Sequence, residues 1–370
     1  MPHVTSSPRL TGVRRDAYEA VRRAVAAPYD SIRLRQELAE RLAPALPSDV
    51  SAIATSDPEF GVLVHALTWD YPDALLGTYY TEVYPQEGAL HFIDLARSGE
   101  YASTESGPVE REYLRAGGLG DKLHVAFVEQ GRMWGGACLT RVAGAPSFSD
   151  EELSLAALVA PLIGAGLRRA ALLEAAQQAD AGADESAPTA PGVAVYDARG
   201  RLLLREGRAS CYLADLADIG TPSDLPSSVA AALTRLRWRM RAADAVHDPR
   251  AEAGVRVRGE SGRWYSVHAS ATDTTSAQSA GQTVVVLTPL GGGERANVLA
   301  QLYGLTPRER EIVGRVARGE SGKQIAAALG LSSHTVQAHI DNACAKIGAR
   351  GRREIVARLF IDTVTARMAH

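Results

Sequence analysis

The sequence predicts a multidomain protein with two α+β domains followed by an all-α domain of four helices. Strands and helices are indicated together in residues 31–178 and again in residues 192–290, whereas residues 301–366 carry only capped helical segments. The 370 residues are enough for two or three separate cores. A composition of 46% hydrophobic and 22% charged residues is ordinary for a folded soluble domain.

Composition also argues against several classes of protein. No stretch approaches the ~20 apolar residues of a membrane span, and the N-terminus lacks the apolar core of a signal peptide. We therefore expect a cytoplasmic protein that does not bind membranes. Cys138, Cys211 and Cys344 lie far apart without ligand spacing, so we expect neither disulfides nor a metal site. We find no Ser/His/Asp, Cys/His or paired-carboxylate arrangement, so no catalytic residues, enzymatic activity or cofactor are expected.

Residues 1–30 are expected to form an N-terminal helical segment. Helical periodicity extends to Ala43 but breaks at Pro28-Tyr29-Asp30, where Asp30 or Ser31 can cap the following helix. Two pairs of strands come next, and the capping box Ser149-Asp150-Glu151-Glu152 then begins a long helix toward Gln178. The expected strands are 50–55, 61–67, 123–129 and 133–141.

This order of elements resembles a GAF domain over residues 31–178. The similarity is carried by Trp134-Gly135-Gly136-Ala137-Cys138-Leu139 and Pro146-Ser147-Phe148-Ser149, which resemble the last strand and helix entry of that family. The Asn-Lys-Phe-Asp-Glu signature of GAF domains that bind cyclic nucleotides is missing. The resemblance therefore implies a sensory domain without implying the class of its ligand.

Aromatic residues are concentrated in the same region, where 12 of the chain's 21 lie between Val50 and Ala170. Such a cluster can line an apolar pocket with hydroxyls that orient a small-molecule effector, or it can simply be core packing. The candidate ligand-binding residues are Trp69, Tyr71, Tyr79, Tyr80, Phe92 and Tyr113.

The long helix carries a heptad-like apolar run with one charged exception. The run occupies positions 155, 158, 162, 165, 169, 172 and 176. It is able to pair two protomers, or to pack on its own sheet, and Pro161 would kink a continuous coiled coil. We favour a mixed interpretation, in which part of the helix packs and part dimerises.

Residues 179–191 are rich in Ala, Asp, Ser and Pro and are expected to be a linker. Residues 192–290 then show two strands, two helical segments and three strands, an order similar to that of a PAS domain. His247 and His268 are single histidines, which are more often packed or surface residues than iron ligands. Gly291-Gly292-Gly293-Glu294 begins a second expected linker, residues 291–300.

Four short helices are predicted in residues 301–366. Thr306-Pro307-Arg308-Glu309 and Ser321-Gly322-Lys323-Gln324 are capping boxes, and Gly330 ends the second helix. A turn of three residues leads to a longer helix, Ser333 to Ile347. A short helix, a glycine-containing turn and a longer helix form the helix-turn-helix geometry. Its buried face is expected to be Val336, Ile340, Ala343 and Ile347.

The motifs from Leu305 to Glu311, from Leu331 to His339 and from Lys346 to Gly348 closely resemble the LuxR-type helix-turn-helix domain. The resemblance implies that the outward face of the third helix enters the major groove of DNA. Residues 295–370 hold 12 Lys and Arg against 6 Asp and Glu, a net charge of +6, whereas the remainder carries −9. This positive charge agrees with phosphate contact. The candidate DNA-binding residues are Lys323, Ser333, His334, Thr335, Gln337, Ala338, Asp341, Lys346 and Arg350.

Asp341 departs from the family pattern, which commonly has a lysine at this position. The carboxylate either repels nearby phosphates or accepts a hydrogen bond from a cytosine amino group. Gln337 is a candidate for bidentate contact with adenine.

Together these features predict a cytoplasmic LuxR-type transcription regulator that is controlled by a small molecule or a protein signal. The expected partners are double-stranded DNA, a small-molecule effector and a second copy of the chain, with RNA polymerase as a further candidate. The fourth helix resembles the family's dimerising helix, which makes Ile355 and Leu359 candidate dimer contacts. The alternative is a protein-interaction regulator whose helix-turn-helix no longer binds DNA.

Overall fold

The structure, a computed structural model, describes residues 10, 12–57, 59–180, 190–220, 224–242, 253–271 and 282–359. The chain divides into two compact units. The first comprises Met1–Ala170 and Ala190–Thr288, and the second comprises Ala171–Thr189 and Pro289–His370. His247, residues 360–366 of the expected helical domain and most of the expected linker 179–191 lie outside the described residues.

The first sheet of the first unit is antiparallel and contains the two predicted pairs of strands. Its order is β2-β1-β5-β4-β3, and Ile53 pairs with Leu67 on one side and with Ala137 on the other. Strand β4 begins earlier than expected because its first residues pair with the end of β5. The strands are β1 Val50–Ser56, β2 Leu63–Trp69, β3 Ala102–Ser103, β4 Leu119–Glu129 and β5 Arg132–Val142.

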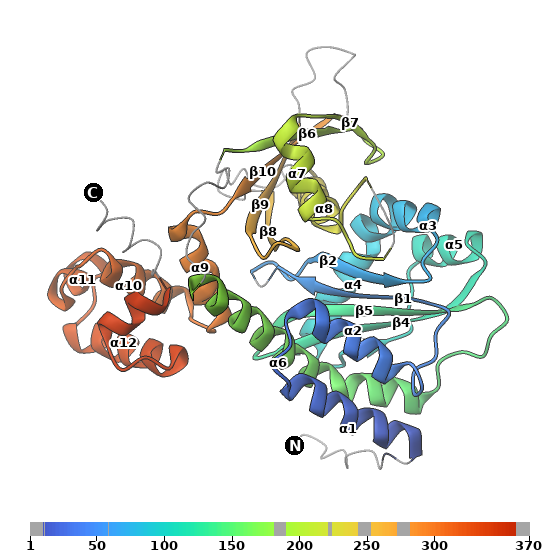
Figure 1. Ribbon diagram of the computed structural model, residues 1–370, viewed down its shortest axis with the longest axis horizontal. Helices are drawn as coiled ribbons and strands as arrows, with labels where there is room; N and C mark the ends of the chain where they lie inside the picture. Colours follow the sequence, from blue (N-terminus) through green and yellow to red (C-terminus); the bar gives the residue numbers. More distant parts are fainter. Residues whose placement is uncertain are drawn as a thin grey trace. The chain divides into compact units, whose positions relative to one another are not determined.

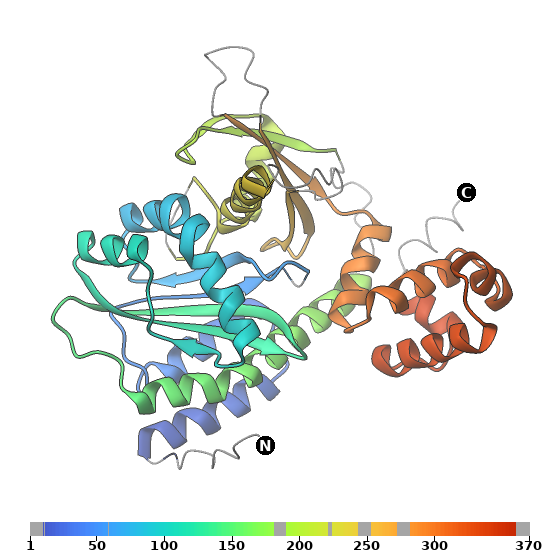
Figure 2. The ribbon, with the colours of Figure 1, turned by 180° about the vertical axis from the view of Figure 1, so that it is seen from behind.

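Helices cover both faces of this sheet (Figures 1 and 2). Gly135 and Gly136 of β5 face opposite sides of the sheet. A Cβ atom added to Gly135 would lie 2.9 Å from the Leu167 side chain, and one added to Gly136 would lie 2.6 Å from the Phe92 side chain. Glycine therefore lets a helix approach closely on each side. One face carries α1 (Gly12–Ala26), α2 (Ser31–Leu42) and α6 (Asp150–Asp180). The other carries α3 (Asp73–Thr78), the π-helix η1 (Tyr79–Gly88), α4 (Ala89–Ser98) and α5 (Pro108–Ala116).

Two local signals in the sequence are confirmed here. Asp30 caps α2 by accepting a hydrogen bond from the Arg33 amide at 2.7 Å. Ser149 and Glu152 form the expected capping pair at the start of α6. Residues Asp150–Ala175 of α6 are long and apolar enough to cross a membrane by length and composition, but half of that stretch is buried inside the protein.

The second sheet has the order β7-β6-β10-β9-β8. Its elements follow the predicted order of two strands, two helices and three strands. They are β6 Gly192–Tyr196, β7 Leu202–Arg205, α7 Gly207–Asp215, α8 Ser227–Ala242, β8 Gly254–Arg258, β9 Trp264–Ala271 and β10 Thr283–Pro289. Helix α8 packs on β8 and β9 and also on β2 and η1 of the first sheet (Figure 1).

The two sheets of the first unit share one continuous hydrophobic core. The segment around Ile219 extends the first sheet at its β2 edge, since Ile219 donates to the carbonyl of Ala66 at 3.0 Å and accepts from Thr68 at 2.8 Å. Gly220 has a φ of +112°, and a Cβ there would lie 2.1 Å from the Thr68 carbonyl oxygen. A second connection joins the buried Asp57 carboxylate to the Arg256 amide of β8 at 2.6 Å. The two α+β regions of the first unit therefore fold together.

The second unit contains the predicted helical domain. Its named helices are α9 Gly292–Leu302, α10 Pro307–Ala317, α11 Gly322–Leu329 and α12 Ser333–Ile347, and residues 352–359 are also helical. Both predicted capping boxes are present, at Thr306 and at Ser321. Gly330 and Gly348 end α11 and α12 in the left-handed conformation. All four residues of the expected buried face of α12 lie in the core.

Two sequence predictions about this domain are wrong. Residues 291–300 are not a linker, because α9 begins at Gly292 and buries Ala296 and Ala300 in the core of the domain. Ile355 and Leu359 do not form an exposed dimer contact. They are only 0% and 3% exposed and belong to the same core, so neither side chain is available to a second copy of the chain.

Candidate DNA-binding face and sensory cavity

The outward face of α12 is exposed along its length. Ser332 caps the helix by accepting from the Thr335 amide at 3.0 Å, and Val336 and Ile340 anchor the opposite side. This anchoring leaves Ser333, His334, Gln337, Ala338 and Asp341 exposed and Thr335 half-buried. The structure thus brings the predicted α12 residues together on one surface, while their contact with DNA stays a prediction.

A short polar network runs across this face. The Gln337 side-chain amide donates to Asp341 Oδ1 at 2.9 Å, and Arg352 donates to Gln337 Oε1 at 3.4 Å. Arg352 begins the last helix and also lies beside Gly322, the first residue of α11. Sequence reasoning did not single out Arg352, because its place beside Gln337 depends on how the last helix packs on α11 and α12.

The predicted basic positions differ in their surroundings. Lys323 and Arg350 are exposed. Lys346 instead forms an ion pair of 2.7 Å with Glu309, whose other contacts close the capping box of α10. Burial would raise the pKa of Glu309, but Lys346 and the Thr306 amide outweigh it and hold that pKa below its usual range. Lys346 therefore joins α12 to α10 in addition to adding positive charge.

In the first unit a cavity of about 30 Å³ lies beside the first sheet. Tyr71, Tyr79 and Tyr80, three of the predicted ligand-binding residues, line it. Tyr84, another member of the same aromatic cluster, also lines it, as do Cys138 and Ser227, which were not predicted. Ser227 comes from the start of α8, far away in the sequence, so no local pattern indicates it. The remaining lining residues are Ala52, Ala54, Leu63, Ala66, Leu76 and Gly136.

The other three predicted ligand-binding residues do not line this cavity. Tyr113 is buried behind it, where its hydroxyl lies 2.6 Å from that of Tyr71. Phe92 is fully buried and packs edge-on against His124, and Trp69 is half-buried at the end of β2. Core packing, the alternative considered for the aromatic cluster, thus accounts for Phe92.

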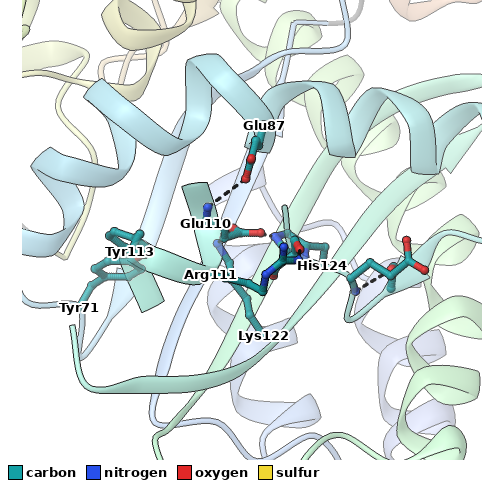
Figure 3. A network of polar contacts seen from close by, with 10 residues as sticks. Tyr71, Glu87, Glu110, Arg111, Tyr113, Lys122 and His124 are labelled. Carbon is teal, nitrogen blue, oxygen red and sulfur yellow. Dashed lines mark hydrogen bonds and ion pairs between the residues drawn. The ribbon is translucent and has the colours of Figure 1, made fainter. Parts of the chain in front are cut away.

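A buried charged cluster of Glu110, Lys122 and His124 lies near Tyr71 and Tyr113 (Figure 3). Lys122 pairs with Glu110 at 2.6 Å, His124 Nε2 lies 3.1 Å from the same carboxylate oxygen, and the Lys122 ammonium sits 4.4 Å from the centre of the Tyr79 ring. The Glu87 carboxylate accepts from the amide of Glu110 and so fixes the start of α5. Through the contact of Lys122 with its ring, this network fixes the position of Tyr79.

Burial and charge set the protonation of this cluster. Burial, aided by the nearby Lys122, lowers the pKa of His124 to about 4, so the imidazole is neutral at pH 7. Burial alone would raise the pKa of Glu110, but Lys122 and His124 outweigh it and keep that pKa below its usual range. No group of three or more His, Cys, Asp or Glu side chains in the part of the chain that the structure describes is able to hold a metal ion.

Taken together, the two short capped helices, the turn at Gly330 and the exposed face of α12 define a helix-turn-helix domain. Residues 304–359 match the family model described as bacterial regulatory proteins, luxR family. The spore germination protein GerE of Bacillus subtilis is 42% identical over 56 residues, which are 15% of this chain and 76% of that protein. The chain therefore belongs to the luxR family of bacterial regulatory proteins.

Longer relatives match over stretches of similar length. The transcriptional regulatory protein UhpA of Escherichia coli is 43% identical over 56 residues, 15% of this chain and 29% of that protein. The uncharacterized transcriptional regulatory protein YhcZ of Bacillus subtilis is 43% identical over 58 residues, 16% of this chain and 26% of that protein. The similarity thus covers less than a third of either relative.

Among solved structures, the GAF domain of a phosphoenolpyruvate-protein phosphotransferase from Coxiella burnetii has a TM-score of 0.31 at 17% identity. It covers 42% of this chain and 95% of that one. Escherichia coli SdiA has a TM-score of 0.31 at 13% identity, covering 93% of this chain and 97% of that one. Both TM-scores are below 0.5, so neither likeness assigns a function.

Proposed function

We propose that this chain is a cytoplasmic transcription regulator that binds double-stranded DNA through the outward face of α12. The observation that carries the proposal is that face itself, which presents Ser333, His334 and Gln337 to solvent while the opposite side of the helix is buried. An exposed helix that follows a short capped helix and a glycine turn has the geometry that enters a major groove. Lys323, Arg350 and Arg352 supply positive charge around it.

Gln337 is the residue best suited to read a base. A glutamine amide has the donor and the acceptor that adenine requires in the major groove. In the free protein the side-chain nitrogen of Gln337 donates to Asp341, and its oxygen accepts from Arg352. The orientation of the amide is therefore restricted before DNA binds. We assign Asp341 the role of a positioning group for Gln337 whose charge opposes DNA phosphates.

We further propose that a small molecule in the cavity of the first unit regulates DNA binding. A ligand changes an equilibrium only if it binds two arrangements of the protein with different affinities. The cavity suits such a role because η1 and α8 both line it and pack on each other, and α8 also packs on strands of both sheets. RNA polymerase is a candidate partner of the DNA-bound form.

Self-association is assigned to α6. The helix buries one stripe, which includes Val159, Ile163 and Leu167, against its own unit. The heptad positions Leu158 and Leu162 lie on a different stripe and are only half-buried. This arrangement suits the mixed interpretation, in which one face packs and another pairs with a second copy of the chain.

The rival function is a protein-interaction module that has lost DNA binding. Fluorescence anisotropy with a pool of labelled duplexes, measured over a series of salt concentrations, separates the two. A DNA-binding protein loses affinity linearly in log salt with a slope of about −0.9 for each phosphate it neutralises. An affinity that is absent at low salt, for protein that remains folded, would support the rival.

A further inference from the structure

The proposed effector cavity is lined almost entirely by uncharged groups. Among the described residues that line it there is no Asp, Glu, Lys, Arg or His. The tyrosines are neutral, because burial raises the pKa of Tyr79 and of Tyr80, and burial likewise raises the pKa of the Cys138 thiol. A charged ligand would therefore lose its hydration without gaining a counter-charge from the wall, which is costly in an apolar site.

The charged groups just behind the wall are engaged within the protein. Lys122 is paired with Glu110 at 2.6 Å. The Asp218 carboxylate accepts from the Ala66 amide at 2.8 Å, from the Ser227 amide at 2.9 Å and from the Ser227 hydroxyl at 2.6 Å. Glu110 neutralises Lys122, and three hydrogen bonds take up the oxygens of Asp218, which does not line the cavity, so neither group presents an open charge to a ligand.

The hydroxyl groups of the wall are used by the protein, with one exception. Tyr71 bonds to Tyr113 at 2.6 Å, and Tyr84 donates to and accepts from the backbone of Leu63. The Tyr80 hydroxyl lies within reach of Asp218 and Ser227. The Tyr79 hydroxyl is buried and has no oxygen or nitrogen atom as hydrogen-bond partner; it interacts only with the Cys138 thiol, a weak partner that also lines the cavity. A buried hydroxyl with only a weak partner is costly, and a ligand oxygen would satisfy it.

The volume of the cavity limits the size of the ligand. A water molecule needs about 10–15 Å³ measured in this way, so 30 Å³ holds about two water-sized groups. A longer molecule must displace the wall. Three of the four lining tyrosines, Tyr79, Tyr80 and Tyr84, belong to η1, a π-helix that contains Pro85. Because π-helical turns are rare and occur frequently at functional sites, η1 is the part of the wall that we expect to move.

From these contacts we infer that the cavity takes a small, uncharged, largely apolar molecule of the alcohol or ketone class, whose oxygen bonds to the Tyr79 hydroxyl. The inference rests on the proposed function, which makes this cavity the effector site. It excludes carboxylates, phosphates, nucleotides and ammonium compounds as ligands of the closed cavity.

Saturation-transfer NMR on the full chain tests the inference with matched probes, ethanol against ethylammonium and acetone against acetate. We expect ethanol and acetone to give saturable signals and their charged counterparts to bind at least about tenfold more weakly. Tyr79→Phe removes the free hydroxyl and should weaken the binding of both neutral probes by about three- to tenfold. Tyr196→Phe, which alters a buried tyrosine of the second sheet that donates to Asp224, should leave it unchanged.

A second variant tests the same cavity without altering the Tyr79 hydroxyl. Ala66→Leu fills the cavity from β2 and should abolish the signals of both neutral probes in protein with a cooperative thermal transition. The inference is overturned if the charged probes bind as well as the neutral ones, if neither neutral probe saturates, or if Tyr79→Phe has no effect. DNA affinity of the same samples is measured in parallel. If the unmodified chain binds DNA but the neutral probes do not bind, the proposed ligand class is wrong and the proposed function stands. If the unmodified chain does not bind DNA, the proposed function is wrong.

Discussion

Asp341 presents a carboxylate where LuxR-type domains commonly carry a lysine. It lies on the exposed face of α12 and accepts a hydrogen bond from Gln337 at 2.9 Å. Two effects compete when DNA approaches this face. The carboxylate repels phosphates, and it also restricts the side chain that we expect to read adenine. The alternative role is a hydrogen bond from a cytosine amino group, which Asp341 can accept through Oδ2 while Oδ1 keeps the bond from Gln337.

Asp341→Lys separates these roles. We expect tighter binding to all duplexes and a salt dependence steeper by about one unit of slope, because one repulsive charge becomes one phosphate contact. Asp341→Asn keeps an acceptor for Gln337 and should give a smaller gain. Anisotropy titrations on duplexes that differ at single positions provide the measurement. A loss of about 1–3 kcal/mol confined to one base pair would instead show that Asp341 reads cytosine.

The aromatic hydroxyls show how far single residues are predictable. Tyr71, Tyr79 and Tyr80 are indicated by their clustering in the sequence, because an aromatic cluster with hydroxyls suits a pocket. Ser227 and Cys138 line the same cavity without any such pattern. Their positions depend on packing between strands and helices that lie far apart in the chain, and a local pattern carries no information about it.

Among elements, those with local signals are predicted well. The caps at Asp30, Thr306 and Ser321 satisfy backbone amides within a few residues, so short motifs are sufficient to place them. Helix α9 has the opposite character. It begins at a run of glycines and is stabilised by the burial of Ala296 and Ala300 in the core of the helical domain, which no local motif indicates. The π-helix η1, interrupted by Pro85, was likewise not predicted.

Two substitutions distinguish core helices from dimer helices. Leu359→Asp places a charge where the side chain is 3% exposed, so we expect the helical domain to lose about 3 kcal/mol or more of stability. Leu162→Glu alters a half-buried position of α6 and should weaken self-association while the thermal transition is retained. Sedimentation velocity and circular dichroism on both variants provide the measurement. A folded, monomeric Leu359→Asp variant would restore the last helix as the dimer contact.

The buried histidines of β2 and β4 predict a dependence on pH. Burial, with the adjacent Arg35, lowers the pKa of His65 to about 3, and burial with Lys122 lowers that of His124 to about 4. Histidines in the unfolded chain have a pKa of about 6.5, so between these values the unfolded state binds protons that the folded state does not. Stability is therefore complete above pH ~6.5 and falls by about 1.4 kcal/mol per pH unit for each histidine as the pH decreases toward 4.

Urea unfolding at pH 7, 6 and 5 measures this dependence. Burial also lowers the pKa of His91, which adds in the same direction. His124→Gln retains a donor for Glu110. It should reduce the change of the unfolding free energy with pH by the contribution of one histidine. An unfolding free energy that stays constant or rises toward pH 5 would contradict the neutral, buried state of these side chains.

For the whole molecule, we expect two cooperative folding units, fewer than the three domains that the sequence predicts. The sequence predicts two separate α+β domains that would fold independently, yet the two sheets share a core, and Ile219, between α7 and α8, exchanges backbone hydrogen bonds with β2. Differential scanning calorimetry should therefore resolve two transitions, one for the first unit and one for the helical domain. Gly220→Val should lower the first transition only, since its side chain would meet the Thr68 carbonyl. Three transitions, or a Gly220→Val effect limited to half of the first unit, would contradict a shared core.

The outward face of α12 is expected to read DNA through Gln337. Duplexes enriched by the full chain from a random pool, titrated with unmodified protein and with Gln337→Glu, test this reading. Glutamate matches glutamine in size but has no amide to donate to adenine N7. We expect the unmodified chain to prefer its enriched duplex over a scrambled one, and Gln337→Glu to lose about 1–3 kcal/mol at an adenine position while its melting temperature is unchanged. Enriched and scrambled duplexes bound equally by the unmodified chain, or an unaltered preference in Gln337→Glu, would contradict the account.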